Sequence, residues 1–219
     1  LAFALQVTIG FIALFTDWGI AALGAASNYV AVLLSYGRTG MEFMFGGLVG
    51  SSDSLGFIFA FSVLPVIIFF SSLIAVLYHA RIMQWMIRIM GGGLRAILHT
   101  SHTESLSAAA NVFVGQAEAP LVARPYIPGM TRSELFAVMV GGMASIAGSV
   151  MAGYVALGVP LEYLLAASFM AAPGGLLMAK LMEPETDTPA EPRQGEQLAD
   201  EKYINLIDAA ATGAINGLQ

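Results

Sequence analysis

Residues 55–78 of the chain read LGFIFAFSVLPVIIFFSSLIAVLY, and no side chain in this stretch carries a formal charge. About 20 apolar residues are enough for a helix to cross the hydrocarbon core of a bilayer. The stretch therefore predicts a transmembrane helix. Pro65 lies near its middle and predicts a kink there, because proline lacks the amide hydrogen that the interior of a helix uses.

The composition of the whole chain favours the same environment. Hydrophobic residues make up 57% of the 219 residues and charged residues only 11%, whereas soluble domains carry about 25% charged residues. We therefore expect a multi-pass, all-α integral membrane protein. The absence of cysteine excludes disulfides and cysteine-ligated metals, and the lack of a large basic patch argues against a nucleic-acid partner.

The positions of charges, glycines and prolines divide the rest of the chain. We expect further spans over 1–16, 131–158 and 160–182, and helices lying along the membrane surface over 18–37, 79–90 and 203–219. Residues 41–54 are rich in glycine and serine and are expected to form a connection. Residues 183–202 hold seven acidic and two basic residues and predict a disordered linker.

The ends of these elements carry three further predictions. Arg81, Arg88 and Arg95 follow the span at 55–78, which places this side of the chain, and the acidic linker with it, in the cytoplasm. Thr131 and Glu134 have the spacing of a capping box and predict a helix start. Because the chain begins inside an apolar run and stops inside a helical pattern, we expect sequence to be missing at both ends.

Residues 103–128 are mostly small and apolar, but polar residues, a glycine and prolines interrupt them. The interrupting residues are Glu104, Asn111, Gly115, Gln116, Glu118, Pro120, Arg124, Pro125 and Pro128. One helix cannot run through this pattern, so we expect two short helices that meet at Gly115–Pro120. Such a re-entrant hairpin is tolerated at membrane depth only where protein buries it or where it lines a cavity.

Two pairs of polar residues are candidates for binding. Gln116 can donate and accept hydrogen bonds and Glu118 can accept them, which suits a polar, uncharged solute such as a sugar or a nucleobase. The alternative is that both belong to a solvated surface loop. Asn111 and Ser145 carry oxygen atoms of the kind that bind a small cation, although such residues also join helices in membranes.

A third group is compatible with a metal site or a serine–histidine pair. Its members are His99, Ser101, His102 and Glu104. The histidine spacing is weak evidence, and no distant third ligand stands out. We therefore favour the simpler interpretation that these are polar residues at the membrane surface.

The hairpin sequence resembles the first re-entrant hairpin of the concentrative nucleoside transporter family. The resemblance rests on Glu104–Leu121, Arg124–Ile127, Thr131–Leu135, Gly141–Tyr154, Leu64–Ser72 and Asn205–Ala214. It implies a homotrimer in which a scaffold domain holds a moving transport domain and two hairpins carry the substrate. The second hairpin and its part of the nucleoside site are absent from this chain.

The same resemblance implies a division of the chain and a set of site residues. Residues 1–78 would be scaffold helices, 79–182 part of the transport domain, 183–202 the acidic linker and 203–219 the start of an interfacial helix. The implied nucleoside-binding residues are Gln116, Ala117, Glu118 and Val150, and the implied sodium ligands are Asn111, Val114, Ser145 and Ile146. Ala117 replaces the family's usual threonine, which leaves the preference for purines or pyrimidines open.

The resulting interpretation is a secondary active transporter and not an enzyme. It would take up nucleosides across the bacterial inner membrane, with sodium as the coupling ion and no covalently bound cofactor. Three alternatives remain. The first is a transporter of another polar solute, or one coupled to protons through Glu118, and the second is an intramembrane enzyme that uses His99, Ser101 and His102. The third is a purely structural membrane subunit.

Overall fold

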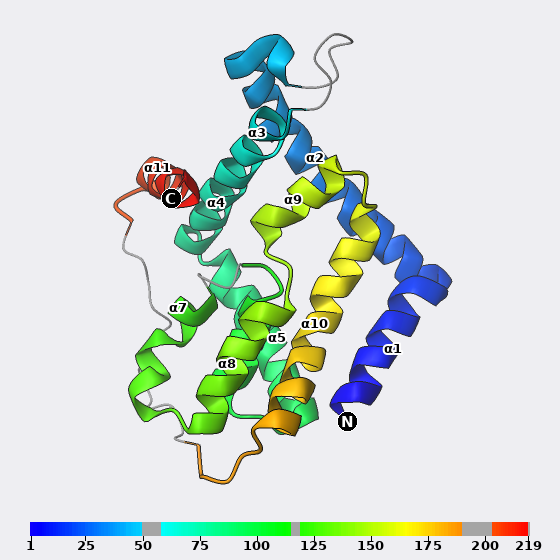
Figure 1. The fold of residues 1–219 in the computed structure, drawn as a ribbon, viewed down its shortest axis with the longest axis vertical. Coiled ribbons are helices and arrows are strands. Elements are labelled where there is room, and N and C mark those ends of the chain that lie inside the picture. The colour runs from blue at the N-terminus through cyan, green and yellow to red at the C-terminus, as the bar shows by residue number, and fades with distance from the viewer. Residues whose placement is uncertain (50–57, 115–118, 190–202, 219) are drawn as a thin grey trace.

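The computed structural model describes residues 1–49, 58–114, 119–189 and 203–218, and every regular element in these ranges is a helix (Figure 1). The all-α prediction is therefore confirmed. The elements are α1 (Ala2–Phe15), α2 (Asp17–Phe45), η1 (Gly46–Leu48), α3 (Phe59–Ser62), α4 (Leu64–His79), α5 (Ile82–Leu98), α6 (His102–Ala110), α7 (Ala119–Ala123), η2 (Arg124–Gly129), α8 (Arg132–Ala144), α9 (Gly148–Ala156), α10 (Leu161–Met182) and α11 (Leu206–Leu218).

Within the described residues, three helical stretches are long and apolar enough to cross a membrane. They are α2, Ala60–His79 and α10. The last confirms the span expected over 160–182. The prediction for α2 was too short, because its helix continues through Gly40 to Phe45, where we expected a connection to begin at Met41. Its placement along the membrane surface stays a prediction.

Pro65 lies just after a one-residue interruption of its helical stretch. α3 ends at Ser62 and α4 begins at Leu64, so Pro65 is the second residue of α4. In the first turn of a helix the amide hydrogen has no partner within the helix, and proline is tolerated there.

A continuous helix over the span expected at 131–158 is wrong. It begins as predicted, because Thr131 Oγ1 accepts a hydrogen bond from the Glu134 amide and Glu134 Oε2 accepts one from the Thr131 amide. However, α8 ends at Ala144, Ser145 is extended with φ −106° and ψ 159°, and α9 begins only at Gly148. The many glycines and serines in this stretch have low helix propensity.

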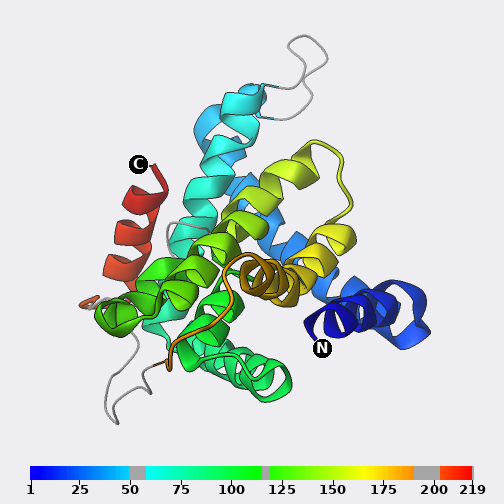
Figure 2. The ribbon, with the colours of Figure 1, turned by 60° about the horizontal axis from the view of Figure 1, so that its bottom comes forward.

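One hydrophobic core joins α5, α6, α7, α8 and α10 with the turn that follows α6. Its fully buried members include Ile87, Ala109, Ala110, Val114 and Ala119. α5 contributes one apolar face as predicted, with Met83, Ile87, Gly91 and Leu94 buried at helical spacing. α8 and α10 lie side by side in both views (Figures 1 and 2).

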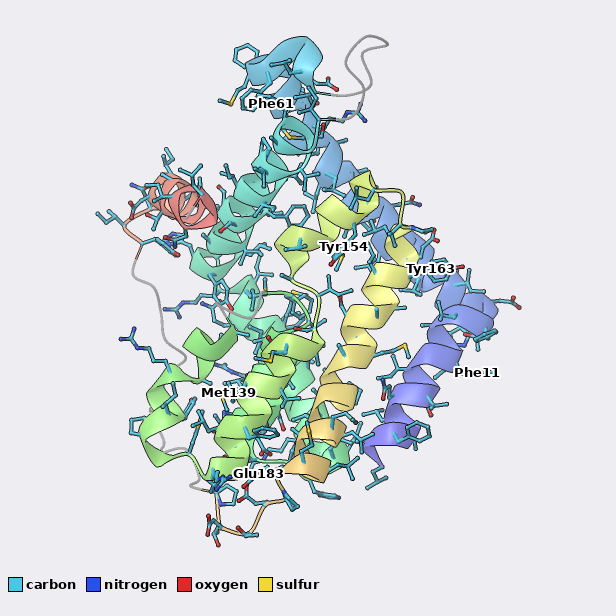
Figure 3. All side chains as sticks on the ribbon, viewed as in Figure 1. Phe11, Phe61, Met139, Tyr154, Tyr163 and Glu183 are labelled. Atoms are coloured by element: carbon cyan, nitrogen blue, oxygen red, sulfur yellow. The ribbon has the colours of Figure 1, made fainter. Side chains whose placement is uncertain are left out.

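Apolar side chains also cover much of the outer surface. α11 packs along α4, where Ser72 Oγ donates to the Ala210 carbonyl over 2.8 Å. Elsewhere Phe11, Met139, Tyr154 and Tyr163 are exposed (Figure 3). Exposed apolar surface on this scale fits contact with lipid or with further protein.

The linker expected over 183–202 is ordered at its start. Ser133 Oγ donates to the Glu183 carbonyl over 2.7 Å, and Thr131 Oγ1 donates to Glu185 Oε2 over 2.9 Å. Arg132 and Glu183 form an ion pair at 2.9 Å. The prediction of disorder is therefore wrong for 183–189, because these residues find partners at the start of α8. Residues 190–202 lie outside the described residues.

Candidate functional site

The interrupted region contains two short helices, as predicted. α6 and α7 pack against each other, and residues 111–118 separate them in the sequence. Val114 and Ala119, on either side of 115–118, are fully buried. Gln116, Ala117 and Glu118 themselves lie outside the described residues, so their roles stay predictions.

A capping box sets the start of α6. Ser101 Oγ accepts from the Glu104 amide over 3.2 Å, and Glu104 Oε2 accepts from the Ser101 amide over 3.1 Å. α6 ends at Ala110, whose carbonyl accepts from the amides of Phe113 and Val114. Within the described residues, no backbone hydrogen bond reaches the carbonyl oxygens of 111–114. The amides four residues further along the chain, which are the usual partners of such carbonyls, lie outside the described residues.

The turn after α6 lies against the break between α8 and α9. A Cβ atom on Gly148 would lie 2.5 Å from the Phe113 carbonyl oxygen, and one on Gly141 would lie 3.0 Å from Asn111 Nδ2. A side chain at position 148 would force the backbone at Phe113 to move, and one at position 141 would displace the Asn111 amide by a few tenths of an ångström. The irregular backbone after α6 thus lies against the break between α8 and α9. The break at residues 145–147 was not predicted from the sequence.

Three buried polar atoms on these two segments have no hydrogen-bond partner among the described residues. Asn111 is only 2% exposed, and both its Oδ1 and its Nδ2 are unpaired. Ser145 Oγ is also buried and unpaired. Leaving a buried polar group unpaired costs about 1–3 kcal/mol, so such a cluster points to a bound ion, a solute or water.

The four implied sodium ligands fall on these two segments. Asn111 and Val114 lie in the turn after α6, and Ser145 and Ile146 lie in the break after α8. Side-chain oxygens and free carbonyls at broken helices form the set of hard donors that binds a small cation. The donor chemistry therefore fits sodium. Val150 lies in the first turn of α9 and is 39% exposed.

The third group of polar residues occupies structural positions. Ser101 caps α6, the His102 ring packs edge-on against Tyr126 with centroids 5.9 Å apart, and His99 ends α5 in the left-handed conformation. In the part of the chain that the structure describes, no three histidine or acidic side chains gather as metal ligands. These contacts favour the simpler interpretation of the group.

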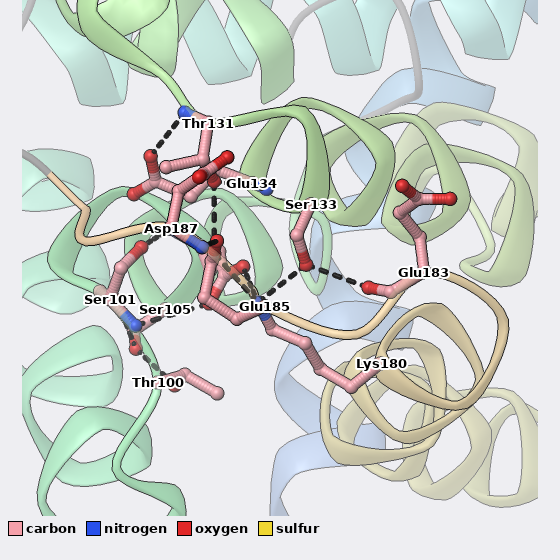
Figure 4. Close-up of polar contacts among 11 residues, drawn as sticks. Thr100, Ser101, Ser105, Thr131, Ser133, Glu134, Lys180, Glu183, Glu185 and Asp187 are labelled. Atoms are coloured by element: carbon pink, nitrogen blue, oxygen red, sulfur yellow. Dashed lines mark hydrogen bonds and ion pairs between the residues drawn. The ribbon is translucent and has the colours of Figure 1, made fainter.

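Sequence reasoning missed a charged cluster centred on Lys180 (Figure 4). The Lys180 ammonium forms an ion pair with Glu104, which is 1% exposed, and donates to Ser133 Oγ over 2.8 Å and to Glu185 Oε2 over 3.2 Å. It thereby joins the base of α6 to α8 and α10. Lys180 itself was the signal in the sequence, because an ionisable side chain in an apolar span is energetically unfavourable unless it has a partner.

Glu185 lies in this cluster, outside the helices. Burial of its carboxylate favours the protonated form, but hydrogen bonds from Thr131, Lys180 and the Asp187 amide outweigh burial, so that the pKa of Glu185 is lowered.

Three protein-family models match successive parts of the chain. The description "Na+ dependent nucleoside transporter N-terminus" covers residues 1–48, "Nucleoside recognition" covers 60–161, and "Na+ dependent nucleoside transporter C-terminus" covers 163–219.

Relatives with similar sequences occur in bacteria and animals. The chain is 57% identical to an uncharacterized transporter of Haemophilus influenzae, covering 100% of this chain and 52% of that protein. It is 48% identical to the nucleoside permease NupC of Helicobacter pylori (99% and 52%) and 42% identical to human sodium/nucleoside cotransporter 1 (96% and 32%). The chain thus spans about half the length of these bacterial relatives.

Solved structures show the same fold. CNTnw in an inward-facing substrate-bound state matches with a TM-score of 0.93 and 55% identity, over 99% of this chain and 53% of that one. A variant of CNTnw in an outward-facing state also matches with a TM-score of 0.93, at 54% identity and the same coverage.

Proposed function

Because the chain belongs to the concentrative nucleoside transporter family, we propose that it forms part of a sodium-coupled symporter for nucleosides. The transporter performs no covalent chemistry and drives the uptake of its solute with the cation gradient. It works in the bacterial inner membrane as a homotrimer, with residues 79–182 in the moving domain.

The observation that carries this proposal is the cluster of unpaired polar atoms at two helix breaks. Asn111 and Ser145 carry these atoms, and the approaches of Gly141 to Asn111 and of Gly148 to Phe113 bring the two segments together. A sodium ion held by Asn111, Ser145 and the carbonyls of Val114 and Ile146 would satisfy them. Binding of the ion would raise the affinity for the solute, because the two sites share a coupling free energy.

The solute-binding assignment rests on residue chemistry and on the relatives. Gln116 and Glu118 supply the donors and acceptors that a nucleoside needs, Ala117 lies between them, and Val150 offers an apolar contact to the base. The names of the Helicobacter pylori and human relatives specify nucleosides. Coupling to protons through Glu118 is the second candidate, since an acid in that position can carry a proton.

Uptake measurements separate these candidates. The product of the complete reading frame, reconstituted in proteoliposomes, should concentrate tritiated uridine or adenosine when an inward sodium gradient is imposed. A proton gradient without sodium should give no accumulation. Accumulation with the proton gradient alone would reject sodium coupling. Nucleosides would be rejected as the substrate class if the protein takes up another polar solute and no nucleoside inhibits that uptake.

Glu118→Gln should weaken nucleoside affinity at least about tenfold.

A further inference from the structure

Ser107 lies on α6 one turn before Asn111, and it is only 1% exposed. Its hydroxyl oxygen is buried and has no hydrogen-bond partner in the part of the chain that the structure describes. A buried serine in a helix ordinarily donates to the carbonyl four residues earlier. Ser105 on the same helix does this, because its Oγ donates to the Ser101 carbonyl over 2.8 Å. Ser107 therefore departs from the usual behaviour of a helical serine.

The direction of Ser107 follows from its neighbours on α6. Residues 104, 107 and 111 share one helix face, since they are spaced by three and four residues. Glu104 on this face reaches Lys180 of α10, and Asn111 reaches Gly141 of α8. The opposite side of α6 lies against α5, where a Cβ on Gly91 would lie 3.3 Å from the Ser105 carbonyl oxygen. Ser107 is thus directed towards α8 and α10, beside the unpaired Asn111 amide.

We infer that Ser107 Oγ holds a water molecule that binds the sodium ion beside Asn111. The inference rests on the proposed sodium site and adds a residue to it. Ser107 and Asn111 are neighbours on one helix face, yet neither side chain hydrogen-bonds to the other or to another described residue. One bridging water can join two such groups. The water hydrogen-bonds to Ser107 Oγ and to the Asn111 amide, and its oxygen faces the ion. This arrangement pairs polar atoms that are otherwise unpaired.

The test compares two buried serines of the same helix. Ser107→Ala removes a hydroxyl that has no protein partner, so the melting temperature without sodium should be unchanged or higher. Half-maximal uptake should need about three- to tenfold more sodium, as expected for the loss of one hydrogen bond. The nucleoside half-saturation concentration at saturating sodium should stay the same. The rise in melting temperature that sodium produces should shrink in parallel.

Ser105→Ala is the matched control. It removes a buried hydroxyl that has partners in Ser101 and Thr100, so it should lower the melting temperature and leave the sodium requirement unchanged. All measurements use the product of the complete reading frame, in detergent for melting and in proteoliposomes for uptake.

The outcomes that oppose the inference are distinct from those that oppose the sodium site itself. An unchanged sodium requirement in Ser107→Ala, together with a raised one in Asn111→Ala, overturns the role of Ser107 alone. A Ser107→Ala protein whose melting temperature without sodium falls as far as that of Ser105→Ala also overturns it. If neither Ser107→Ala nor Asn111→Ala changes the sodium requirement, the proposed sodium site fails.

Discussion

Asn111 on the hairpin and Gly141 on α8 approach so closely that a Cβ on Gly141 would lie 3.0 Å from Asn111 Nδ2. The glycine thus leaves room for a buried amide that has no partner among the described residues. Because α8 ends at Ala144, the same contact brings the amide to the part of α8 that leads into the break before α9. The spacing of α6 from α8 therefore controls the geometry of the proposed sodium site.

Gly141→Ala should disturb this geometry without removing any ligand. The new methyl group must push the Asn111 amide by a few tenths of an ångström, and we expect the sodium concentration for half-maximal uptake to rise about tenfold. Gly92→Ala is the control, since a Cβ at Gly92 on the exposed side of α5 has nothing within 4 Å. It should leave sodium dependence unchanged. A Gly141→Ala transporter with normal sodium dependence would mean that Asn111 does not contact the ion.

Lys180→Met should destabilise the fold strongly. The substitution leaves Glu104, 1% exposed, without its ion-pair partner, and loss of one member of a buried pair costs about 3–5 kcal/mol. The double variant Glu104→Gln/Lys180→Met should recover part of this loss, because no buried charge is left unpaired. Thermal melting in detergent measures both.

The control for this prediction is Arg132→Met. Arg132 pairs with Glu183 but its side chain is 84% exposed, and exposed pairs contribute little. Equal melting temperatures for Lys180→Met and Arg132→Met would show that the Lys180 cluster does not hold α6, α8 and α10 together.

Glu185 should make stability depend on pH at the acidic end. Its pKa is lower in the folded protein than in the unfolded one, so its contribution is complete above the unfolded pKa and is lost as pH falls through the folded pKa. Between neutral pH and about pH 3, the wild-type melting temperature should fall further than that of Glu185→Gln. Parallel curves for the two proteins would contradict this role of Glu185.

The acidic segment after α10 should face the cytoplasm. Arg95 of α5 leads into the base of α6, and the Lys180 cluster joins that base to residues 183–185, so both belong to one end of the molecule. The chain has no cysteine, and Thr188→Cys therefore adds a single labelling site in it. A membrane-impermeant maleimide should react in inside-out vesicles. Reaction of this cysteine only in right-side-out cells would show that the acidic segment faces the periplasm and would contradict the predicted topology.

The features that were predictable from the sequence are local ones. Thr131 and Glu134 lie three residues apart, so their capping box needs no tertiary information, and the prolines around α7 exclude a continuous helix wherever the chain folds. The break at Ser145 was not predictable in the same way. The glycines and serines lower helix propensity over the whole stretch and do not specify where the helix stops. The segment after the break lies against Phe113, which is distant in the sequence. Lys180 and Glu104 likewise meet only after α6 and α10 have packed.

For α2 we predicted an end to the helix where the structure has none. Gly37 and Gly40 weaken a helix locally, and we expected a connection after them. Gly37 instead lies where a Cβ would be 2.9 Å from the Phe69 ring, so this glycine serves the packing of α2 on α4. The roles of Gln116, Ala117 and Glu118 lie outside the described residues and stay predictions.

The most direct test of the sodium site is a sodium titration of nucleoside uptake by Asn111→Ala in proteoliposomes. Loss of a ligand to a charged group weakens binding by about 1.5–3 kcal/mol, which corresponds to a rise of about 10- to 150-fold in half-saturating sodium. Nucleoside affinity should recover once sodium is high enough to refill the site. A sodium requirement equal to that of the wild type, or a nucleoside affinity that stays low at every sodium concentration, would contradict the account.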